Sequence, residues 1–333
     1  MSETTVETKK ITIIQAINEA IAEAMEADPK VIVLGEDVAD REGGGVVGVT
    51  RGLSTKFGDE RVRSTPITEQ AIIGAAIGAS IGGYKPVAEI MLMNFTTVAM
   101  DMIVNHAAKL RFMSGGQTGV PIVIRMMTGA GISSAGQHSD FLEAWFAHTP
   151  GMKVVMPSNP EDAKGLMLSA IADPDPVMFV ECTRAYFTPY ETPVKVAPIP
   201  LGKAKVTRQG TDVTIISYSE IFLRATAAAA ELAKEGISAE LIDLRTISPW
   251  DRETVLASVR KTGRAVIAHE AVKQFGVGAE IAAVLQDELF GVLKAPVKRL
   301  GAPGAPVPFS KVLENVFLVS VADIVAAARA TLA

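Results

Sequence analysis

The chain has 333 residues, a formal net charge of −5, and 48% hydrophobic against 21% charged residues. This composition excludes a wholly disordered chain, and the acidic balance, with no basic stripe, argues against binding to nucleic acid. The length is sufficient for roughly two domains of about 150 residues each.

Membrane and disulfide classes are disfavoured as well. The single cysteine, Cys182, excludes a disulfide framework and a multi-thiolate metal site. The first ten residues are polar and mixed in charge, unlike a secretion signal. The longest uncharged apolar stretch, residues 71–84, is too short and too rich in glycine to cross about 30 Å of hydrocarbon. We therefore expect a cytoplasmic protein with no membrane partner.

In the first half of the chain, helical and strand patterns alternate. Thr12 and Gln15 have the spacing of a capping box, before apolar residues at helical intervals. Short continuous apolar runs then predict strands that are buried on both faces of a parallel sheet. Ser158, Pro160 and Glu161 predict another capped helix start. The predicted helices are 14–25, 71–83, 97–113 and 161–172, and the predicted strands are 31–34, 87–92, 121–127, 154–156 and 177–181.

A proline-rich stretch interrupts this alternation. Four prolines between residues 188 and 202 exclude a regular helix or a central strand, so residues 188–203 are predicted to be a linker. The pattern then resumes with strands at 213–217, 239–244 and 265–269 and helices at 223–234, 252–261, 281–289 and 324–332, and a loop rich in proline and glycine at 301–308. We predict an α/β protein of two domains, 1–187 and 204–333, each an open, mostly parallel sheet flanked by helices.

One short motif suggests a hydrolase. Residues 78–82, Gly-Ala-Ser-Ile-Gly, match the G-x-S-x-G pattern of a nucleophile elbow, in which a strained turn after a strand exposes the serine. Here the residues before Ser80 have helical spacing, and Gly74, Gly78 and Gly82 lie four residues apart. This pattern favours a helix face for close packing, and a serine hydrolase acting through Ser80 is kept as an alternative.

Two other segments carry more chemistry. Residues 65–70, Thr-Pro-Ile-Thr-Glu-Gln, place a proline and then Glu69 at the start of an apolar helix. A glycine-rich loop, residues 129–139, follows a predicted strand and delivers His138 just before a helix. A histidine in a loop at the carboxyl end of a strand is suited to donating a proton or binding an oxyanion, although it can equally tether the loop.

A series of motifs along the chain resembles a known family. The resemblance is to the beta subunit of the thiamine-diphosphate-dependent first component of 2-oxo acid dehydrogenase complexes, of pyruvate or acetoin type, and it extends from about Lys10 to the C-terminus. Its motifs are Leu-Gly-Glu-Asp-Val (34–38), Thr-Pro-Ile-Thr-Glu (65–69), Phe-Met-Ser-Gly-Gly (112–116), Gln-His-Ser (137–139), Asp-Ala-Lys-Gly-Leu (162–166), Leu-Arg-Thr-Ile-Ser-Pro (244–249) and Phe-Gly-Val-Gly-Ala-Glu (275–280).

The resemblance implies a transketolase-like fold and a role for Glu69 in activating the cofactor. A carboxyl group bonded to the pyrimidine ring nitrogen favours the imino tautomer of the neighbouring amine, which takes the proton from the thiazolium carbon. Ile67 and Phe95 are expected to shield this carboxyl group, with the aromatic ring of Phe95 against the pyrimidine.

By the same resemblance, His138 lies at the active-site channel and steadies a substrate oxygen or the incoming lipoyl group. The family also has a structural potassium site, made largely of backbone carbonyl groups, and Asp175 stands where some relatives have asparagine. The corresponding residues here are Ile122, Ala170, Ile171, Asp173 and Asp175.

One absence points to a partner chain. Thiamine enzymes hold the diphosphate through Mg²⁺ with a Gly-Asp-Gly segment, and this sequence contains none. The chain would therefore bind the pyrimidine half of the cofactor, and an alpha subunit in an α2β2 heterotetramer would hold the diphosphate and Mg²⁺. The implied substrate is a small 2-oxo acid or acetoin, and the acyl group passes to a lipoyl-bearing acyltransferase. A non-catalytic assembly subunit is a further alternative.

Overall fold

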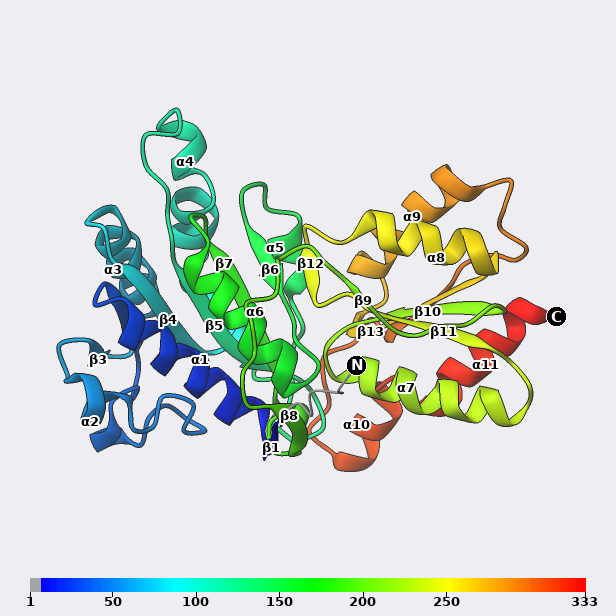
Figure 1. Cartoon of the computed structure of the whole chain (residues 1–333), viewed down its shortest axis with the longest axis horizontal. Helices are drawn as coiled ribbons and strands as arrows, with labels where there is room; N and C mark the ends of the chain where they lie inside the picture. The colour runs from blue at the N-terminus through cyan, green and yellow to red at the C-terminus, as the bar shows by residue number, and fades with distance from the viewer. Residues whose placement is uncertain (1–6) are drawn as a thin grey trace, which may run out of the picture. The chain divides into compact units, whose positions relative to one another are not determined.

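The computed structural model describes residues 7–333, and residues 1–6 of the polar N-terminal stretch lie outside the described residues. The internal contacts divide the chain into two compact units. The first comprises the chain up to Met127 together with Thr149–Leu201, and the second comprises Thr128–His148 together with Gly202–Ala333. Figure 1 shows α-helices beside β-sheets in both units, as the two-domain α/β prediction requires. The predicted boundaries at 187/188 and 203/204 stay predictions.

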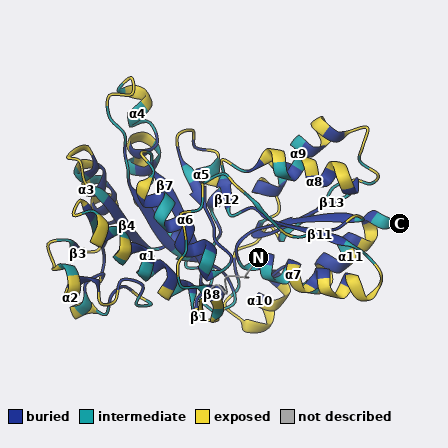
Figure 2. Cartoon of the chain, viewed as in Figure 1, coloured by how far each residue is buried: buried dark blue, intermediate teal, exposed yellow. Residues whose placement is uncertain are grey.

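The first unit is built on a parallel sheet. Its strands lie in the order β6-β7-β5-β4-β2-β3, and the pairs β2–β3, β2–β4, β4–β5 and β6–β7 are parallel. Apart from the edge strand β3, whose Arg63 is exposed, the strands form from sequence segments that are mostly buried on both faces (Figure 2). The strands are β2 (Val31–Gly35), β3 (Val62–Ser64), β4 (Lys85–Leu92), β5 (Val123–Thr128), β6 (Lys153–Val155) and β7 (Val177–Cys182).

Helices cover this sheet. The capping box is confirmed: Thr12 accepts from the backbone N–H of Gln15 at the start of α1, and the Gln15 side chain accepts from the Thr12 N–H. The helix after β6 is also confirmed, but its cap is Asn159, not Ser158. Since Pro160 is its first helical residue, the residue directly before it forms the cap, and Asn159 accepts from the Asp162 N–H at 2.9 Å. The helices are α1 (Ile13–Ala27), α2 (Leu53–Phe57), α3 (Glu69–Ile81), α4 (Leu110–Met113) and α6 (Pro160–Ala172), with single turns at Asp40–Glu42 and Thr183–Ala185.

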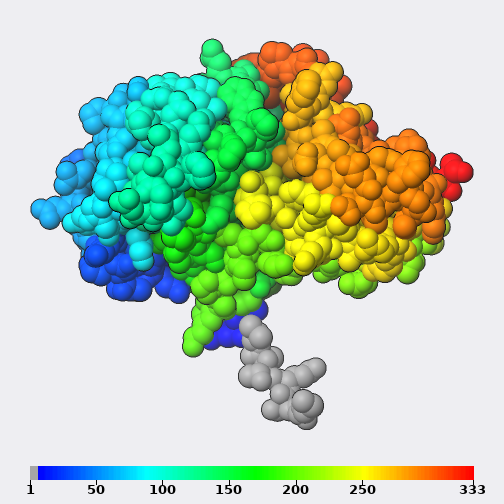
Figure 3. All heavy atoms as spheres, turned by 90° about the horizontal axis from the view of Figure 1, so that it is seen from above, coloured from blue at the N-terminus to red at the C-terminus, as the bar shows by residue number. Residues whose placement is uncertain are grey.

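The prediction of one helix over residues 97–113 is wrong. The segment forms a 3₁₀ turn (Met93–Thr97), a π-helical stretch (Met102–Ala107) and the short α4. The Thr96 hydroxyl donates to the Met93 carbonyl at 2.6 Å, which tightens the first turn, and the Ala108 N–H bonds the Ile103 carbonyl five residues back. Helical periodicity alone does not distinguish these three turn types. In Figure 3, cyan atoms, the colour of this part of the chain, lie at the surface on the face shown.

The predicted linker contains a strand. β8 (Tyr190–Pro193) pairs antiparallel with β1 (Thr8–Ile11) as a separate two-stranded ribbon. The prolines agree with this position, because β8 has a single partner and is not a central strand.

The second unit has a sheet of its own, with helices on both faces. The strand order is β14-β13-β10-β11-β9, in which β9 alone is antiparallel to its neighbour. In Figure 1, α7 and α11 lie on one face of this sheet and α8 and α9 on the other. The elements are β9 (Lys205–Arg208), β10 (Val213–Ser217), β11 (Ala239–Asp243), β12 (Thr246–Ser248), β13 (Ala265–Val272), β14 (Lys298–Ala302), α5 (Glu143–Ala147), α7 (Ser219–Lys234), α8 (Arg252–Thr262), α9 (Val277–Leu289), α10 (Lys311–Phe317) and α11 (Val321–Leu332).

Within the described part of the chain, no helix has both the length and the apolar character that crossing a bilayer requires.

Candidate active site

Glu69 is the first residue of α3 and follows the carboxyl end of β3. Glu69 is only 8% exposed. The segment between β3 and α3 is tied to the end of β2, because the Thr65 N–H donates to the Gly35 carbonyl at 2.8 Å. The start of a helix favours a negative charge, so a buried carboxyl group is tolerated here. The structure therefore holds Glu69 in a defined place and largely away from water.

A second carboxyl group, Glu36, lies near Glu69, and the sequence alone predicts no role for it. Glu36 directly follows β2 and is 5% exposed, and a backbone hydrogen bond from Thr68 reaches it. Burial raises the pKa of Glu36, and the negative charges of Glu69 and Asp37 raise it further. Its Oε1 atom is buried without a hydrogen-bond partner in the described part of the chain. An acceptor left open in this way is suited to a donor from outside the chain.

Phe95 and Ile67 differ in their exposure. Phe95 lies half-buried in the turn that follows β4, whereas Ile67 is 83% exposed. The expected shielding of Glu69 by Ile67 is therefore not provided within this chain, because that apolar side chain faces outward. An exposed isoleucine next to a buried carboxyl group is available to a ligand or a partner chain.

Strand order explains why these residues belong together. Strands β4, β2 and β3 are neighbours in one parallel sheet, and Phe95, Glu36 and Glu69 follow their carboxyl ends. In open α/β sheets this edge is where ligands bind. Carboxyl groups and an aromatic ring in one row of strand ends fit the hydrogen bonding and stacking of a nitrogen heterocycle. The described residues therefore fit the pyrimidine half of thiamine diphosphate.

Beneath this edge lies a buried ion-pair network. Arg125 on β5 donates to both carboxylate oxygens of Glu181 on β7, at 2.8 and 2.7 Å, and also bonds Glu89 on β4. Tyr186 donates to Glu181 at 2.5 Å. The sequence signal was present, because a charged residue inside an apolar strand that is buried on both faces needs a partner. The network ties together three neighbouring strands of the sheet that carries Glu69.

His138 lies in the second unit, in the glycine-rich loop after β5. The loop contains Ser133 and Ala135 in the left-handed region, at φ of 60° and 59°, and the Thr128 hydroxyl donates to the Asp140 carbonyl at 2.6 Å. His138 is half-buried, in agreement with a residue that reaches a channel or tethers its loop.

A different histidine in this unit is fully enclosed. Nδ1 of His269 lies 3.1 Å from the Ala271 carbonyl, and its ring stacks on Tyr218. Burial lowers the pKa of His269 to about 4. The Tyr218 hydroxyl donates at 2.6 Å to Glu143, whose pKa burial raises to about 7. His269 and Glu143 are thus both held in their neutral forms near pH 6.

Ser80 does not form a nucleophile elbow. It lies near the end of α3 rather than on a strand-to-helix turn, is 5% exposed, and donates to the Ile77 carbonyl one turn back at 2.7 Å. The geometry that a serine hydrolase needs is therefore missing at this residue.

The glycine face of α3 is open in this chain. Gly78 is exposed, and a Cβ built there would meet nothing within 4 Å. Ile81 on the same helix is 55% exposed. A helix with an open face of small and apolar residues is suited to contact with another chain.

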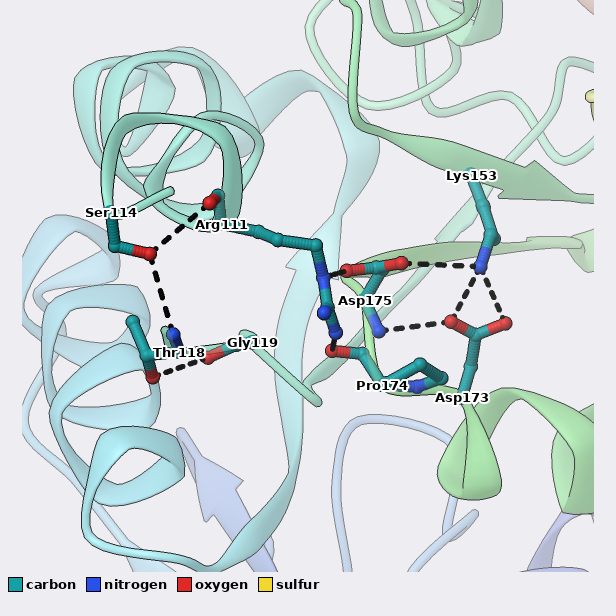
Figure 4. A network of polar contacts seen from close by, with 8 residues as sticks. All are labelled: Arg111, Ser114, Thr118, Gly119, Lys153, Asp173, Pro174 and Asp175. Carbon is teal, nitrogen blue, oxygen red and sulfur yellow. Dashed lines mark hydrogen bonds and ion pairs between the residues drawn. The ribbon is translucent and has the colours of Figure 1, made fainter. Parts of the chain in front are cut away.

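Figure 4 shows Asp173 and Asp175, two of the five predicted potassium positions, with their ion-pair partners Lys153 and Arg111. Both carboxylate oxygens of Asp173 bind the Lys153 ammonium group, at 2.6 and 2.7 Å, and Asp175 pairs with Arg111. Arg111 also donates to the Pro174 carbonyl at 3.0 Å. The carbonyl groups of Ile122 and Ala170 accept backbone N–H groups.

These carboxylates already have cationic partners from the protein, so the arrangement does not fit a K⁺ ion unless Lys153 moves away. The site at Ile122, Ala170, Ile171, Asp173 and Asp175 stays a prediction. Among the described residues, no group of three or more His, Cys, Asp or Glu side chains is placed to hold a metal.

Comparisons with known proteins match both halves of the chain to domain families. Residues 9–188 match the family described as "Transketolase, pyrimidine binding domain", and residues 202–324 match "Transketolase, C-terminal domain". Among solved structures, a "Split gene transketolase, inactive beta4 tetramer" superposes with a TM-score of 0.80 at 25% identity, covering 97% of this chain and 99% of that one.

Curated relatives extend over nearly the whole chain. An "Acetoin:2,6-dichlorophenolindophenol oxidoreductase subunit beta" of Cupriavidus necator is 48% identical over 97% of this chain and 98% of its own length. The protein of the same name from Bacillus subtilis is 44% identical, over 92% and 93%. The human mitochondrial "Pyruvate dehydrogenase E1 component subunit beta" is 44% identical, over 97% and 91%.

Proposed function

Because this chain belongs to the transketolase-like family of pyruvate and acetoin dehydrogenase beta subunits, we propose that it activates thiamine diphosphate through Glu69 for cleavage of a small 2-oxo acid or acetoin. The family implies the cofactor and an alpha-subunit partner. The observation that carries the proposal is the buried carboxyl group of Glu69 at the carboxyl edge of the sheet, next to Glu36 and in the same row of strand ends as Phe95.

The residues of this chain orient the cofactor and hold one proton. Thiamine diphosphate, when bound, supplies the carbanion chemistry that the protein side chains lack. Glu69 would accept a hydrogen bond from the pyrimidine ring and thereby set which ring nitrogen carries the proton. Phe95 would pack against the ring, and Ile67, which is exposed in this chain, would contact the ligand or the partner subunit.

The remainder of the site comes from a second polypeptide. With no Gly-Asp-Gly segment in its sequence, this chain lacks the usual means of holding the diphosphate and Mg²⁺. We place these groups on the alpha subunit, in an α2β2 heterotetramer, with the open glycine face of α3 as part of the contact. A solved relative described as a beta4 tetramer supports the view that this fold assembles through its beta chains.

The acyl group passes to a lipoyl-bearing acyltransferase. We assign His138 to this step, because it lies in a loop after a strand end and can donate a proton to an oxygen or sulfur atom. The names of two relatives specify acetoin, and that of the human relative specifies pyruvate, so both substrates are included in the test below. A cytoplasmic location is part of the same proposal.

The test uses the chain co-purified with its alpha subunit. Glu69→Gln should leave assembly and the far-ultraviolet circular dichroism unchanged, while the rate of deuterium exchange at the thiazolium carbon falls at least about 100-fold. Reduction of 2,6-dichlorophenolindophenol, with acetoin or pyruvate as substrate, should fall in parallel. Glu60→Gln, an exposed carboxyl group of the same unit, serves as the matched control.

Full turnover by the Glu69→Gln complex would disprove the assignment. An assembled wild-type complex that never binds thiamine diphosphate would instead identify this chain as a non-catalytic assembly subunit.

A further inference from the structure

The loop that carries His138 is held by two buried carboxyl groups from distant parts of the chain. The Ala130 N–H donates to Glu270 at 2.8 Å, and the Gly131 N–H donates to Glu314 at 2.8 Å. The Ser133 N–H donates to both oxygens of Glu314, at 3.0 and 3.1 Å. Glu314 lies on α10, more than 180 residues along the chain from this loop.

Burial makes these bonds strong. Glu314 is 0% exposed and Glu270 is 5% exposed. A carboxylate that accepts from backbone N–H groups away from water forms charge-assisted bonds, which are about twice as strong as neutral ones. Loss of such an acceptor leaves the loop amides buried and unpaired, which costs more than the bond itself contributed.

Packing fixes the same loop from a second side. Ala130 belongs to a buried apolar cluster with Val307, Phe317 and two further residues, Ala302 and Leu318. A Cβ on Gly136 would lie 3.3 Å from Pro306, so backbone and proline are in close contact there. Lys311, also on α10, donates to the Gly131 carbonyl. Residues 302–318 thus form a platform for the loop.

The backbone of the loop needs such support. Ser133 and Ala135 both have positive φ, a conformation that is unfavourable for residues other than glycine by roughly 1–2 kcal/mol each. Ser133, at the first of these positions, is the residue that donates twice to Glu314. The buried carboxylate therefore stabilises the conformation that carries the chain towards His138.

We propose that Glu314 and Glu270 are positioning residues that set the place of His138 for acyl transfer to the lipoyl group. The inference rests on the proposed role of His138 and names the elements on which that role depends. Neither carboxyl group is proposed to contact substrate or cofactor, so each acts only through the loop.

Two substitutions test the proposal in the assembled complex. Glu314→Gln keeps the size of the side chain and removes its charge, and Lys311→Ala removes an exposed anchor with little risk to the fold. Glu280→Gln, an exposed carboxyl group on α9, is the matched control. Hydrogen–deuterium exchange reports on the amides of residues 129–139, and stopped-flow kinetics report on acyl transfer to a free lipoyl domain.

We expect Glu314→Gln to speed amide exchange in the loop at least about tenfold and to lower kcat/KM for the lipoyl domain by about tenfold or more. Lys311→Ala should change both in the same direction, by a smaller factor. Deuterium exchange at the thiazolium carbon should stay within about twofold of the wild type, because that step depends on Glu69. A merely structural effect would lower this rate as well.

The experiment distinguishes failure of the positioning role from failure of the proposed role of His138. Faster loop exchange with unchanged acyl transfer would overturn the positioning role, as would unchanged loop exchange in both variants. If His138→Ala, measured alongside, leaves acyl transfer unchanged, the proposed role of His138 fails instead, and this inference fails with it. Should Glu314→Gln not fold, the Lys311→Ala result decides between these outcomes.

Discussion

At the scale of single residues, two buried groups of the second unit have shifted pKa values that change the stability of the fold with pH in opposite directions. Burial raises the pKa of Glu143 to about 7 and lowers the pKa of His269 to about 4. A carboxyl group whose folded pKa is raised stabilises the fold below its unfolded pKa, and this contribution is lost as the pH rises through 7. A histidine whose folded pKa is lowered contributes stability above pH 6.5, which is lost as the pH falls through 4.

These two slopes oppose each other between pH 4.5 and 6.5, and single substitutions should separate them. Glu143→Gln keeps an acceptor for Tyr218 and removes the descending contribution, so its stability should rise with pH relative to the wild type, by on the order of 2–3 kcal/mol in all between pH 4.5 and 7. His269→Asn should show the reverse trend between pH 4 and 6.5. Urea unfolding at half-unit pH intervals measures both.

Parallel pH profiles for Glu143→Gln and the wild type would show that folding does not raise the pKa of Glu143. Sequence patterns do not identify either group as a buried titrating site, because Glu143 begins a short helix and His269 ends the predicted strand 265–269, although the observed β13 continues to Val272. Tyr218, from a different element, contacts both residues, donating to Glu143 and stacking on His269.

At the scale of elements, the open face of α3 gives a prediction with two parts. Gly78→Ala should stabilise the free chain by about 0.5–1 kcal/mol, since a Cβ there meets nothing within 4 Å and alanine favours the helix. Gly78→Phe should leave the free chain folded but prevent stable assembly with the alpha subunit, because a large side chain separates two closely packed helices.

Denaturant melts of the free chain and size-exclusion chromatography with the alpha subunit check the two parts. Gly58→Ala is unsuitable as a control because Gly58 has φ of 86°. Gly74→Ala, one turn earlier on the same face of α3, tests a position where the added Cβ would contact Met102 at 3.6 Å. Undiminished assembly of Gly78→Phe would exclude this face from the subunit contact.

Elements with strong periodicity were predictable, and weakly patterned ones were not. The strand at 213–217 agrees with β10, a short buried run of mostly apolar residues, and the helix at 252–261 agrees with α8, whose apolar residues recur at helical spacing. The edge strands β9 and β14 were missed, since they carry charged residues and are only partly buried. α10 was missed because it follows a stretch rich in proline and glycine and has only seven residues.

The residues of the candidate site also differ in whether the sequence could predict them. Glu69 could be found from local sequence, because a proline and an acid mark the start of its helix. Glu314 and Glu270 could not, because their importance comes from contacts with loop residues 140 and more positions away. No local pattern in a single sequence reports such a pairing.

At the scale of the whole molecule, the cluster of Lys153, Asp173, Arg111 and Asp175 predicts how the chain responds to salts. If protein cations neutralise these carboxylates, the thermal midpoint should be the same in KCl and in NaCl at equal ionic strength. Lys153→Met should lower the midpoint, and K⁺ should restore part of the loss by occupying the space beside Asp173.

Differential scanning calorimetry of the full chain measures these midpoints, with Lys56→Met, which removes a surface ion pair, as the control. A saturable rise of the wild-type midpoint that is specific to KCl would show that K⁺ displaces Lys153, and the predicted potassium site would then be correct.

The path of the backbone also governs how this protein can be divided. The chain leaves the first unit after Met127, contributes Thr128–His148 to the second, and returns before its final departure near Leu201. A gene truncated at the proline-rich stretch would therefore encode a fragment whose inserted segment has lost the acidic side chains that hold it. Limited proteolysis near Leu201 should likewise release no fragment that stays folded on its own. Chimeras that exchange domains between relatives should fold only when residues 128–148 and 202–333 come from the same protein.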